Sequence, residues 1–543
     1  MSNPVVGIDL GTSNTVIAVV HENKATVIPD RDGRRIHPSV VSFHPNGTVL
    51  VGQEAKRRRI IDPKNTIASA KRLIGRSFRS EPVQATLSRV PYEMIEGDNQ
   101  QPVINARGNE YTIPEISAFI LRHVRALAEE YTGENIESAV ITVPANFDDA
   151  QREATRAGGR IAGLNVLRIL NEPTAAALAY GYGRGMTSRV VIYDFGGGTF
   201  DVTALQLNDR IFEVLSTAGD TFLGGDDIDE RIVDYMLEIF LRQTRVDLRY
   251  NVGAMARLRS VAEQIKCQLS TRSKAVIQVQ EIAYGEGGQA LDLGFTLTVE
   301  ALNAMARELV QRSFLICDEA MKLASIAATQ IDDVVLVGGS TKMPLVREGV
   351  KGYFGIDART DINPDEVVAV GAAIQAAALA RSGAGAGEAP GSVLLDVTPR
   401  ALGIAVVGGY ADTIIERNAQ IPVEQTRVFS TSQDNQATVR IQVCQGESRT
   451  FAENQPLGEL VLEGLRPARR GDVQIEVSFE IDTNGILQVR ALDLETNHEQ
   501  NARVQLLGAS SDEEIAAMAQ RQDQMPAPVD QMQDEEITGI HPV

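Results

Sequence analysis

The sequence predicts an α/β fold made of two duplicated lobes, followed by a separate antiparallel β-domain. Three observations lead to this fold class. Strand-like apolar runs alternate with helical periodicity from Met1 to about Ala380, which is typical of an α/β domain. A short pattern in this region occurs twice, which indicates a duplicated unit. From about Thr398 to Leu507 the apolar period becomes two, as in antiparallel strands.

Length and charge limit the classes of function. The chain has 543 residues, more than a single hydrophobic core usually supports, so several domains are expected. Its 52 basic and 72 acidic residues give a net charge of −20. A protein that binds nucleic acids or anionic membranes generally needs a positively charged surface, so neither is an expected partner of this acidic chain. The basic run at 56–59 is the local exception, and we interpret it as a solvated helix face.

Cysteine usage and the N-terminus favour a cytoplasmic protein. Cys267, Cys317 and Cys444 are widely spaced and odd in number, which fits reduced thiols better than a disulfide framework or a zinc site. The N-terminus lacks the basic start and apolar stretch of a signal peptide. The longest nearly uncharged apolar run, 367–380, is too short to span a bilayer and predicts a buried helix.

The repeated pattern carries the strongest functional signal. Residues 6–15 recur as 191–200, with Asp9 and Asp194 in matching positions 185 residues apart. Each copy is an apolar strand ending in Asp, a turn of glycine and hydroxyl residues, and a second apolar strand. Glycine lets backbone N–H groups approach phosphate oxygens closely, and the carboxylate suits Mg²⁺, usually through water. Two such hairpins facing each other predict ATP handling by a duplicated domain.

Three further segments fit the same site. Residues 171–174 place a carboxylate at a strand end before an Ala-rich helix, and 338–342 form another tight glycine turn after a strand. Glu263, Lys266 and Ser270 are spaced to share one face of a helix. All three segments are therefore candidates for contacting the nucleotide.

Two common nucleotide signatures do not explain the chain. It contains no Gly-x-x-x-x-Gly-Lys-Ser/Thr loop. The Asp-Phe-Gly at 194–196 occurs without the His-Arg-Asp loop and the other signatures of protein kinases. The paired hairpins thus remain the basis of the ATP prediction.

A flexible Gly/Ala segment at 381–387 separates the two parts of the chain. The apolar sequence Val-Leu-Leu-Asp follows at 393–396. Linkers normally stay in water, so an apolar linker is unusual and is expected to dock against a domain. Such docking would provide communication between the domains.

The C-terminal part reads as strands and then one short helix. The segment 473–481 alternates apolar and polar residues and turns through 482–485 into 486–489, which predicts a hairpin. Ser511 and Glu514 form a capping-box pattern that predicts a helix start. The polar tail that follows is expected to be disordered.

With these features and several further segments, the chain resembles the DnaK-type heat shock protein 70 chaperone family, whose ATPase domain has the actin/hexokinase fold. The similarity extends from Val5 to about Ala517. The additional matching segments are 70–76, 143–145, 151–155 and 428–431. The resemblance implies four parts: a duplicated, two-lobed actin-like nucleotide-binding ATPase domain at 1–381, an interdomain linker at 382–397, a β-sandwich peptide-binding domain at 398–508, and a short helix with a tail at 509–543.

The resemblance implies an ATP-driven cycle of binding and releasing extended apolar peptides, with ATP/ADP and Mg²⁺ as cofactors. The residues it implies for hydrolysis are Lys71, Glu172, Asp194, Thr199 and Asp201. Those it implies for nucleotide binding are Asp9, Gly11, Thr12, Ser13, Asn14, Gly196, Gly197, Gly198, Glu263, Lys266, Ser270, Gly338, Gly339, Ser340, Lys342 and Asp365. Asp9 and Asp194 would hold the metal, through water.

The resemblance also implies coupling and peptide sites. Its candidates for coupling between domains are Pro144, Arg152, Arg168, Leu394, Leu395 and Asp396. Arg168, Asn171 and Asp396 match positions that engage J-domain co-chaperones, and a nucleotide exchange factor and unfolded polypeptides are further expected partners. The candidates for the peptide cleft are Ile404, Val407, Phe429, Val439 and Ile441, which could equally form the core of the β-domain.

Three departures from the family pattern affect these expectations. The helical lid that usually closes over bound peptide is expected to be truncated, so peptide exchange should be fast in every nucleotide state. Lys342 replaces the usual Arg, and Cys267 replaces a common basic residue, so nucleotide binding should be weaker. The linker has fewer leucines than usual, which leaves the strength of coupling open.

Two other functions remain as alternatives. A sugar or acetate kinase shares the ATPase fold, but it needs neither an apolar linker nor a β-sandwich. A nucleotide-gated adaptor would hold one specific protein without general refolding activity, and the expected short lid keeps this alternative open.

Overall fold

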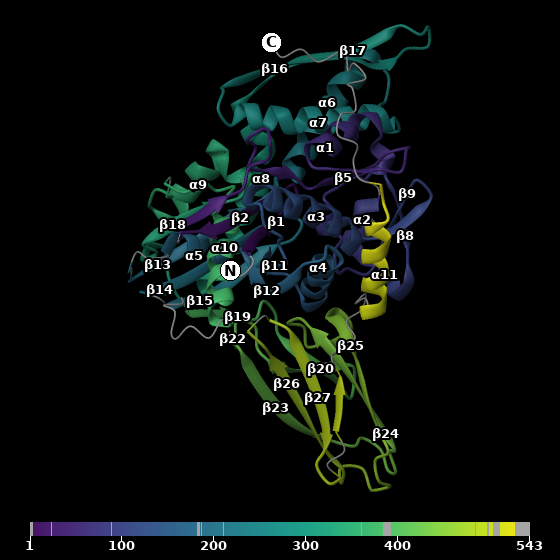
Figure 1. Cartoon of the computed structure of the whole chain (residues 1–543), viewed down its shortest axis with the longest axis vertical. Coiled ribbons are helices and arrows are strands. Elements are labelled where there is room, and N and C mark those ends of the chain that lie inside the picture. The colour runs from purple at the N-terminus through teal and green to yellow at the C-terminus, as the bar shows by residue number, and fades with distance from the viewer. Residues whose placement is uncertain are drawn as a thin grey trace.

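The computed structural model describes residues 4–22, 24–87, 89–181, 185, 187–209, 211–359, 361–383, 393–483, 485–496, 499–502 and 511–526. A large α/β part contains two central sheets, and a β-domain extends from one end of it (Figure 1). The residues 384–392 of the expected linker and the tail beyond 526 lie outside the described residues. Within the described part, no helix combines the length and hydrophobicity that crossing a bilayer requires.

The first lobe (4–181) is built on a sheet in the order β12-β11-β1-β2-β3, with β4 paired to β2. The bounds are β1 Val5–Leu10, β2 Asn14–His21, β3 Lys24–Val27, β4 His37–Pro38, β11 Ser138–Val143 and β12 Asn165–Asn171. Strand β1 pairs parallel with β11 and antiparallel with β2. Helices α3 (Ile113–Thr132) and α4 (Asp149–Ile161) pack on this lobe, and α5 (Glu172–Gly181) follows β12 directly.

Smaller elements complete the first lobe. Two three-stranded sheets have the orders β6-β5-β7 and β10-β9-β8. Their bounds are β5 Val40–Phe43, β6 Val49–Val51, β7 Thr66–Ala68, β8 Glu93–Glu96, β9 Pro102–Ala106 and β10 Asn109–Thr112. The short helices are α1 Gln53–Ile61, η1 Pro63–Asn65, η2 Ala70–Arg72, α2 Glu81–Leu87 and η3 Asp98–Gln100.

The second lobe (187–383) repeats the central arrangement. Its sheet has the order β18-β13-β14-β15-β19-β22, in which β19 is Val393–Val397 and β22 is Gln420–Ile421. Strand β13 pairs parallel with β18 and antiparallel with β14. The strand bounds are β13 Thr187–Phe195, β14 Phe200–Asn208, β15 Ile211–Asp220, β16 Lys274–Tyr284, β17 Ala290–Thr298 and β18 Asp333–Val337. The helix bounds are α6 Gly225–Thr244, α7 Val252–Leu269, α8 Val299–Leu323, η4 Ala328–Gln330, η5 Gly339–Lys342, α9 Pro344–Phe354 and α10 Val367–Gly383.

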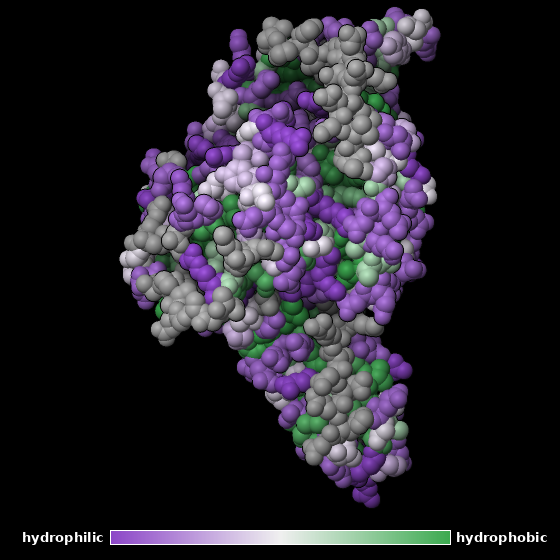
Figure 2. Space-filling model, in the orientation of Figure 1, coloured by the Kyte–Doolittle hydropathy of each residue, from purple (hydrophilic) through white to green (hydrophobic). Residues whose placement is uncertain are grey.

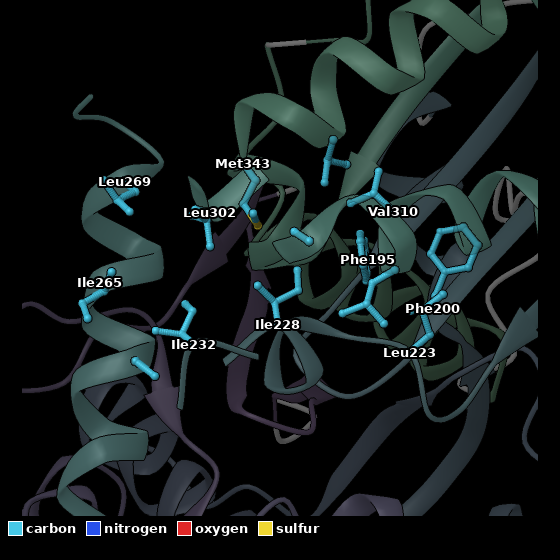
Figure 3. Close-up of a cluster of buried hydrophobic side chains, with 14 of the residues drawn as sticks. Phe195, Phe200, Leu223, Ile228, Ile232, Ile265, Leu269, Leu302, Val310 and Met343 are labelled. Atoms are coloured by element: carbon cyan, nitrogen blue, oxygen red, sulfur yellow. The ribbon is translucent and has the colours of Figure 1, made fainter. Parts of the chain in front are cut away.

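The second lobe's core lies directly behind one glycine turn. Phe195 ends β13, Phe200 begins β14, and both are fully buried among side chains of α6, α7 and α8 (Figure 3). The turn between them is therefore anchored on both sides by aromatic packing, which restricts its movement.

Several elements predicted from sequence are confirmed. The predicted helix at 367–380 is α10, which packs against β1, β2 and α5. The predicted hairpin at 473–489 is formed by β26 and β27, with Ile481 opposite Leu487.

The β-domain consists of two antiparallel sheets, in the orders β21-β20-β24-β25 and β23-β26-β27-β28. The bounds of the first sheet are β20 Leu402–Val406, β21 Tyr410–Ile415, β24 Thr438–Gln445 and β25 Gln455–Glu463, with η6 at Phe451–Glu453. Those of the second are β23 Val423–Ser430, β26 Gln474–Ile481, β27 Leu487–Asp493 and β28 Glu499–Ala502. Apolar residues of both sheets form one common core.

The apolar linker ends in a strand, β19 (Val393–Val397), which joins the two parts. Its Leu394 and Leu395 lie in parallel register with Phe212 and Glu213 of β15. On the other side, β19 pairs with β22 (Gln420–Ile421) of the β-domain. The second lobe's sheet thus continues into the β-domain, and hydrophobic residues show at this junction on a mostly hydrophilic face (Figure 2).

The C-terminal helix α11 (Asp512–Asp523) lies along the first lobe, beside α4 (Figure 1). Ser511 and Glu514 form its predicted capping box. Ile515 is 5% exposed and belongs to the first lobe's core. Arg521 pairs with the buried Glu115 of α3, and Gln522 donates to the Glu115 carbonyl at 3.0 Å. This helix is therefore an integral packing partner of the first lobe.

Candidate functional site

The two glycine turns predicted from the repeat meet between the lobes. A Cβ atom at Gly197 would lie 2.0 Å from Ser13 Oγ, and one at Gly198 would lie 2.5 Å from Thr12 Cγ2. Only glycine permits so close an approach. A cavity of about 90 Å³ lies at this meeting point. Its lining includes Asp9, Gly11, Thr12, Ser13, Asn14, Lys71, Glu172, Asp194, Gly196, Gly197, Thr199, Gly338, Gly339 and Asp365.

Hydrogen bonds turn the carbonyl groups of the second glycine turn toward neighbouring elements. The Gly196 carbonyl accepts the Gly225 amide at 3.0 Å and the Ser340 hydroxyl at 2.8 Å. The Gly197 carbonyl accepts the Asp226 amide at 2.8 Å. The Gly196 amide closes the turn by donating to the Thr199 carbonyl at 3.0 Å, so an anion in the cavity would bind through the other amides of the turn.

Four carboxylates gather beside this cavity: Glu172, Asp194 and Asp201 are buried, and Asp9 is partly buried. Burial, reinforced by the charge of Glu172, raises the pKa of Asp9 and raises that of Asp194 well above its usual value. Burial likewise raises the pKa of Asp201 to about 7. The cluster therefore holds more negative charge than its surroundings neutralise.

Lys71 is the nearest compensating cation. Its ammonium lies 2.5 Å from Glu172 Oε1 and 5.6 Å from the centre of the Phe147 ring, and its side chain is 7% exposed. Two further polar groups orient the carboxylates: Thr142 lies 3.3 Å from Asp9 Oδ1, and the Asn146 amide donates to Asp201 Oδ1 at 2.5 Å.

The residues at the two turns fit a magnesium–nucleotide complex. The excess of buried carboxylate charge would be relieved by a divalent cation, and oxygen donors are the ligands that Mg²⁺ prefers. Asp9 and Asp194 line the cavity and are the next-to-last residues of the corresponding strands β1 and β13. Among the described residues, no group of three or more His, Cys, Asp or Glu side chains forms a metal site, so a metal here would keep water ligands.

A wider cavity of about 400 Å³ continues from the turns to the outer end of the cleft. Its lining contains most of the residues expected around the base and ribose: Glu263, Lys266, Cys267, Gly339, Ser340, Lys342 and Asp365. Gly338 begins this turn at φ 82°, a backbone conformation that favours glycine. The size and the polar lining of this wider cavity suit a nucleoside.

The polar residues at the outer end are already paired with one another. Lys266 donates to Asp229 at 2.7 Å, and Lys342 contacts Asp365. Ser270, the C-cap of α7, donates its hydroxyl to the Lys266 carbonyl at 3.0 Å and does not line either cavity. Its expected contact with the nucleotide is therefore indirect in this arrangement.

The basic run at 56–59 differs from the expected solvated helix face. Lys56 lies 2.6 Å from Glu263 across the cleft, and Arg59 lies 3.8 Å from the same carboxylate. Both side chains are about one-third exposed. This pairing could not be predicted from local sequence patterns, because Glu263 lies 207 residues from Lys56 along the chain.

The coupling candidates converge where the linker strand meets the first lobe. Arg152 is buried and donates to Asn171 Oδ1 at 2.6 Å. The Asn171 amide in turn donates to Asp396 at 2.9 Å, and Thr174 donates to the same carboxylate oxygen at 3.0 Å. Pro144 is the first residue after β11, and its carbonyl accepts the Phe147 amide at 3.1 Å.

A small cavity of about 50 Å³ lies at this junction. It is lined by residues of both domains, including Arg152, Arg168, Leu394, Asp396 and Thr483. Burial lowers the pKa of Arg168, and its Nε has no hydrogen-bond partner among the residues that the structure describes. Arg168 is thus a half-buried cation at the domain boundary.

The peptide-cleft candidates divide into two groups. Ile404 and Ile441 are each 4% exposed and belong to the core of the β-domain, and Phe429 and Val439 pack against that core. Val407 is 81% exposed at the end of β20. Ile404, Val439 and Ile441 lie on β20 and β24 of the first sheet, whereas Phe429 lies on β23 of the second. Their packing fits a core role as well as a cleft role.

Sequence reasoning missed three polar residues of the site: Arg72, Thr142 and Asn146. Arg72 follows Lys71 and contacts the carbonyl of Gly198 at 2.9 Å. Thr142 and Asn146 flank the Val-Pro-Ala segment at 143–145. Their position at the carboxyl end of β11, next to the parallel β1 that carries Asp9, was a usable signal.

The chain matches a protein-family model. The model described as "Hsp70 protein" matches residues 5–539, nearly the whole chain. The matched range includes both glycine turns, the linker strand and the β-domain.

Proposed function

The chain belongs to the Hsp70 family, whose members are ATP-dependent chaperones, and we propose that it hydrolyses ATP to ADP and phosphate between its two glycine turns. We further propose that the nucleotide state controls the binding and release of extended hydrophobic segments of unfolded proteins. The observation that carries this proposal is the adjacency of Glu172 and Asn171: Glu172 pairs with Lys71 in the cleft, and Asn171 bonds the linker strand through Asp396.

The cleft residues have separate tasks in the proposed reaction. Backbone amides of the two turns and the hydroxyls of Thr12, Ser13 and Thr199 hold the phosphates. Lys71 places positive charge where charge builds up on the transferred phosphoryl group, and Glu172 holds its ammonium in position. When bound through Asp9 and Asp194, Mg²⁺ neutralises phosphate charge.

Asp201 would orient the attacking water and take up its proton. Its pKa of about 7 makes proton uptake accessible near neutral pH. Asn146 fixes this carboxylate by donating at 2.5 Å. Phosphoryl transfer needs such positioning more than covalent assistance.

We propose that coupling runs from Glu172 through one peptide bond to Asn171 and then to Asp396 and β19. Movement of Glu172 with the nucleotide state would change the hydrogen bonds that hold the linker strand. Arg152 stabilises this connection because its buried guanidinium also depends on Asn171.

The remaining assignments are part of the same proposal. The two lobes are duplicated actin-like units, and the chain divides into 1–381, 382–397, 398–508 and 509–543. Peptides bind along Ile404, Val407, Phe429, Val439 and Ile441. A J-domain co-chaperone engages Arg168 and Asp396, a nucleotide exchange factor acts on the lobes, and the protein works in the cytoplasm.

The test is steady-state ATP turnover with and without an unfolded apolar peptide and a J-domain protein. Stimulation by both is the expected result. A flat response would contradict the chaperone cycle and favour a nucleotide-gated adaptor. Formation of a phosphorylated sugar or acetate would favour a metabolic kinase.

A further inference from the structure

The carbonyl groups of the second glycine turn are held from two sides of the cleft. Those of Gly196 and Gly197 accept amides at the start of α6, in the second lobe itself. The Gly198 carbonyl instead accepts a hydrogen bond from Arg72 Nη2, in the first lobe, at 2.9 Å. One peptide group of the phosphate-facing turn is therefore held by the opposite lobe.

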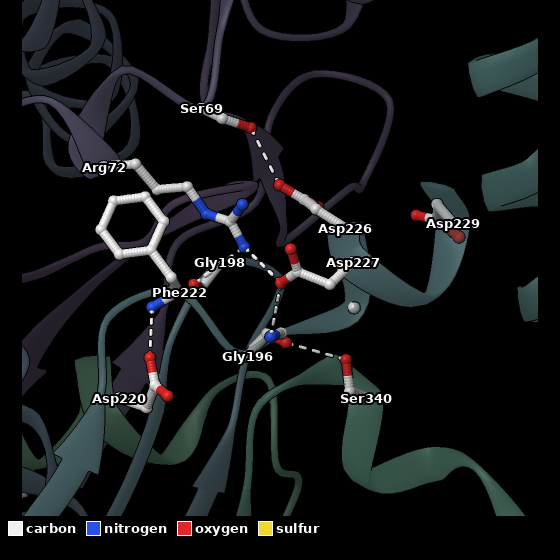
Figure 4. Close-up of polar contacts among 12 residues, drawn as sticks. Ser69, Arg72, Gly196, Gly198, Asp220, Phe222, Asp226, Asp227, Asp229 and Ser340 are labelled. Carbon is white, nitrogen blue, oxygen red and sulfur yellow. Dashed lines mark hydrogen bonds and ion pairs between the residues drawn. The ribbon is translucent and has the colours of Figure 1, made fainter. Parts of the chain in front are cut away.

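Arg72 is itself fixed by its neighbours (Figure 4). The same Nη2 donates to Asp227 Oδ2 at 2.8 Å, and that oxygen also accepts the Gly224 amide at 2.9 Å. The guanidinium carbon lies 5.7 Å from the centre of the Phe222 ring, and the side chain is 11% exposed. Charge-assisted hydrogen bonds at a buried position are strong and directional, so the guanidinium is well oriented.

The identity of Gly198 agrees with this contact. A Cβ atom at this position would lie 2.9 Å from Arg72 Nε and 2.8 Å from Thr12 Oγ1. A side chain here would displace the guanidinium or the first glycine turn. The close approach of Arg72 therefore depends on glycine at 198.

The bonded carbonyl also sets the direction of the next amide. The Gly198–Thr199 peptide is trans, so the Thr199 N–H points away from the carbonyl that Arg72 holds. Thr199 lines the cavity between the two turns. Lys71, on the same 3₁₀ turn as Arg72, lines that cavity as well.

We propose that Arg72 is a positioning residue for phosphoryl transfer. Closure of the two lobes brings its guanidinium onto the Gly198 carbonyl, which aligns the Thr199 amide and Lys71 with the transferred phosphoryl group. This inference rests on the proposed ATPase function. Because the alignment acts on charge that develops in the transition state, loss of Arg72 slows hydrolysis and leaves ATP affinity nearly unchanged.

The chain offers a matched control in Arg76. Its Nη2 also crosses the cleft, donating to Thr221 Oγ1 at 2.9 Å, and its guanidinium carbon lies 5.1 Å from the same Phe222 ring. Its hydrogen bonds go to Thr221 and to the Arg72 carbonyl, not to the glycine turn. Arg76→Met therefore removes a contact between the lobes without removing the contact with Gly198.

The experiment measures the single-turnover rate constant of ATP hydrolysis, the equilibrium affinity for ATP and the melting temperature of each full-length variant. We expect Arg72→Met to hydrolyse ATP at least about tenfold more slowly, with ATP affinity within about threefold of wild type. Arg72→Lys keeps a hydrogen-bond donor on a shorter side chain, so its rate constant should fall between those of wild type and Arg72→Met. Arg76→Met should stay within about twofold of wild type.

Three results would overturn the inference: an unchanged rate constant in Arg72→Met, a loss confined to ATP affinity, or an equal loss in Arg76→Met. If Arg72→Met does not fold, Arg72→Lys decides: a slower rate constant at unchanged affinity supports the inference, and a wild-type rate constant overturns it. A wild-type protein that does not hydrolyse ATP overturns the proposed function, and the inference with it.

Discussion

The linker strand gives the most specific prediction about coupling. Leu394 is half-buried against a core that includes residues of β15 and α5, and Leu395 is half-buried in parallel register with Glu213. Full burial of a leucine side chain stabilises by about 1.5–3 kcal/mol, so half-burial of the two leucines together contributes about 1.5–3 kcal/mol to docking of β19. Replacing both leucines by Asp removes this burial free energy, and docking would then carry the cost of desolvating two carboxylates.

The expected shift of the docking equilibrium is at least about tenfold, since 1.4 kcal/mol corresponds to a factor of ten. We therefore expect the Leu394→Asp/Leu395→Asp variant to lose ATP-triggered release of a bound peptide. Stopped-flow fluorescence with a labelled apolar peptide measures this release. Val393→Asp is the control, because Val393 begins the same strand and is 51% exposed. Release at the wild-type rate from the double variant would refute the reasoning.

Three further predictions concern affinity, stability and pH. Lys342→Arg should bind ATP more tightly, because a planar guanidinium stacks on a base better than an ammonium does; calorimetry that shows no gain would contradict this. Ile515→Ala should lower the free energy of unfolding by about 2–4 kcal/mol in urea titrations, whereas exposed Ala516→Ser should change it little. Burial raises the pKa of Asp201 to about 7, so folding favours its protonated form and its contribution to stability is lost as pH rises through about 7. Nucleotide-free protein should thus be less stable to urea at pH 8 than at pH 6, and Asp201→Asn should reduce that difference; an equal difference in the variant would refute the assignment.

Local patterns in the sequence were sufficient for much of the fold. The repeated strand–turn–strand pattern located both hairpins because glycine and apolar residues act over a few positions. The capping box at Ser511 and the apolar run of α10 are equally local signals, and the structure confirms both elements.

The sequence could not predict which distant elements meet. The docking of α11 on the first lobe depends on Glu115 and Arg521, which lie 406 residues apart. The pairing of Lys56 with Glu263 and the contact of Arg72 with Gly198 also join distant segments. The last two contacts depend on how the lobes close and the first on how α11 docks on the first lobe. Local periodicity encodes neither.

The peptide cleft shows a different limit. Apolar residues at alternating positions predict a strand face, and Ile404 and Ile441 do face inward. Whether such a face packs internally or receives a peptide depends on what lies opposite, and the pattern of a single strand carries no such information.

The central claim is that the cleft controls the β-domain through Asn171. The most direct measurement compares ATP hydrolysis with ATP-triggered peptide release in Asn171→Ala, which removes the contacts to Arg152 and Asp396 and leaves Lys71 and Glu172 in place. The account predicts hydrolysis within about threefold of wild type and peptide release slowed at least about tenfold. Peptide release at the wild-type rate in this variant would contradict it.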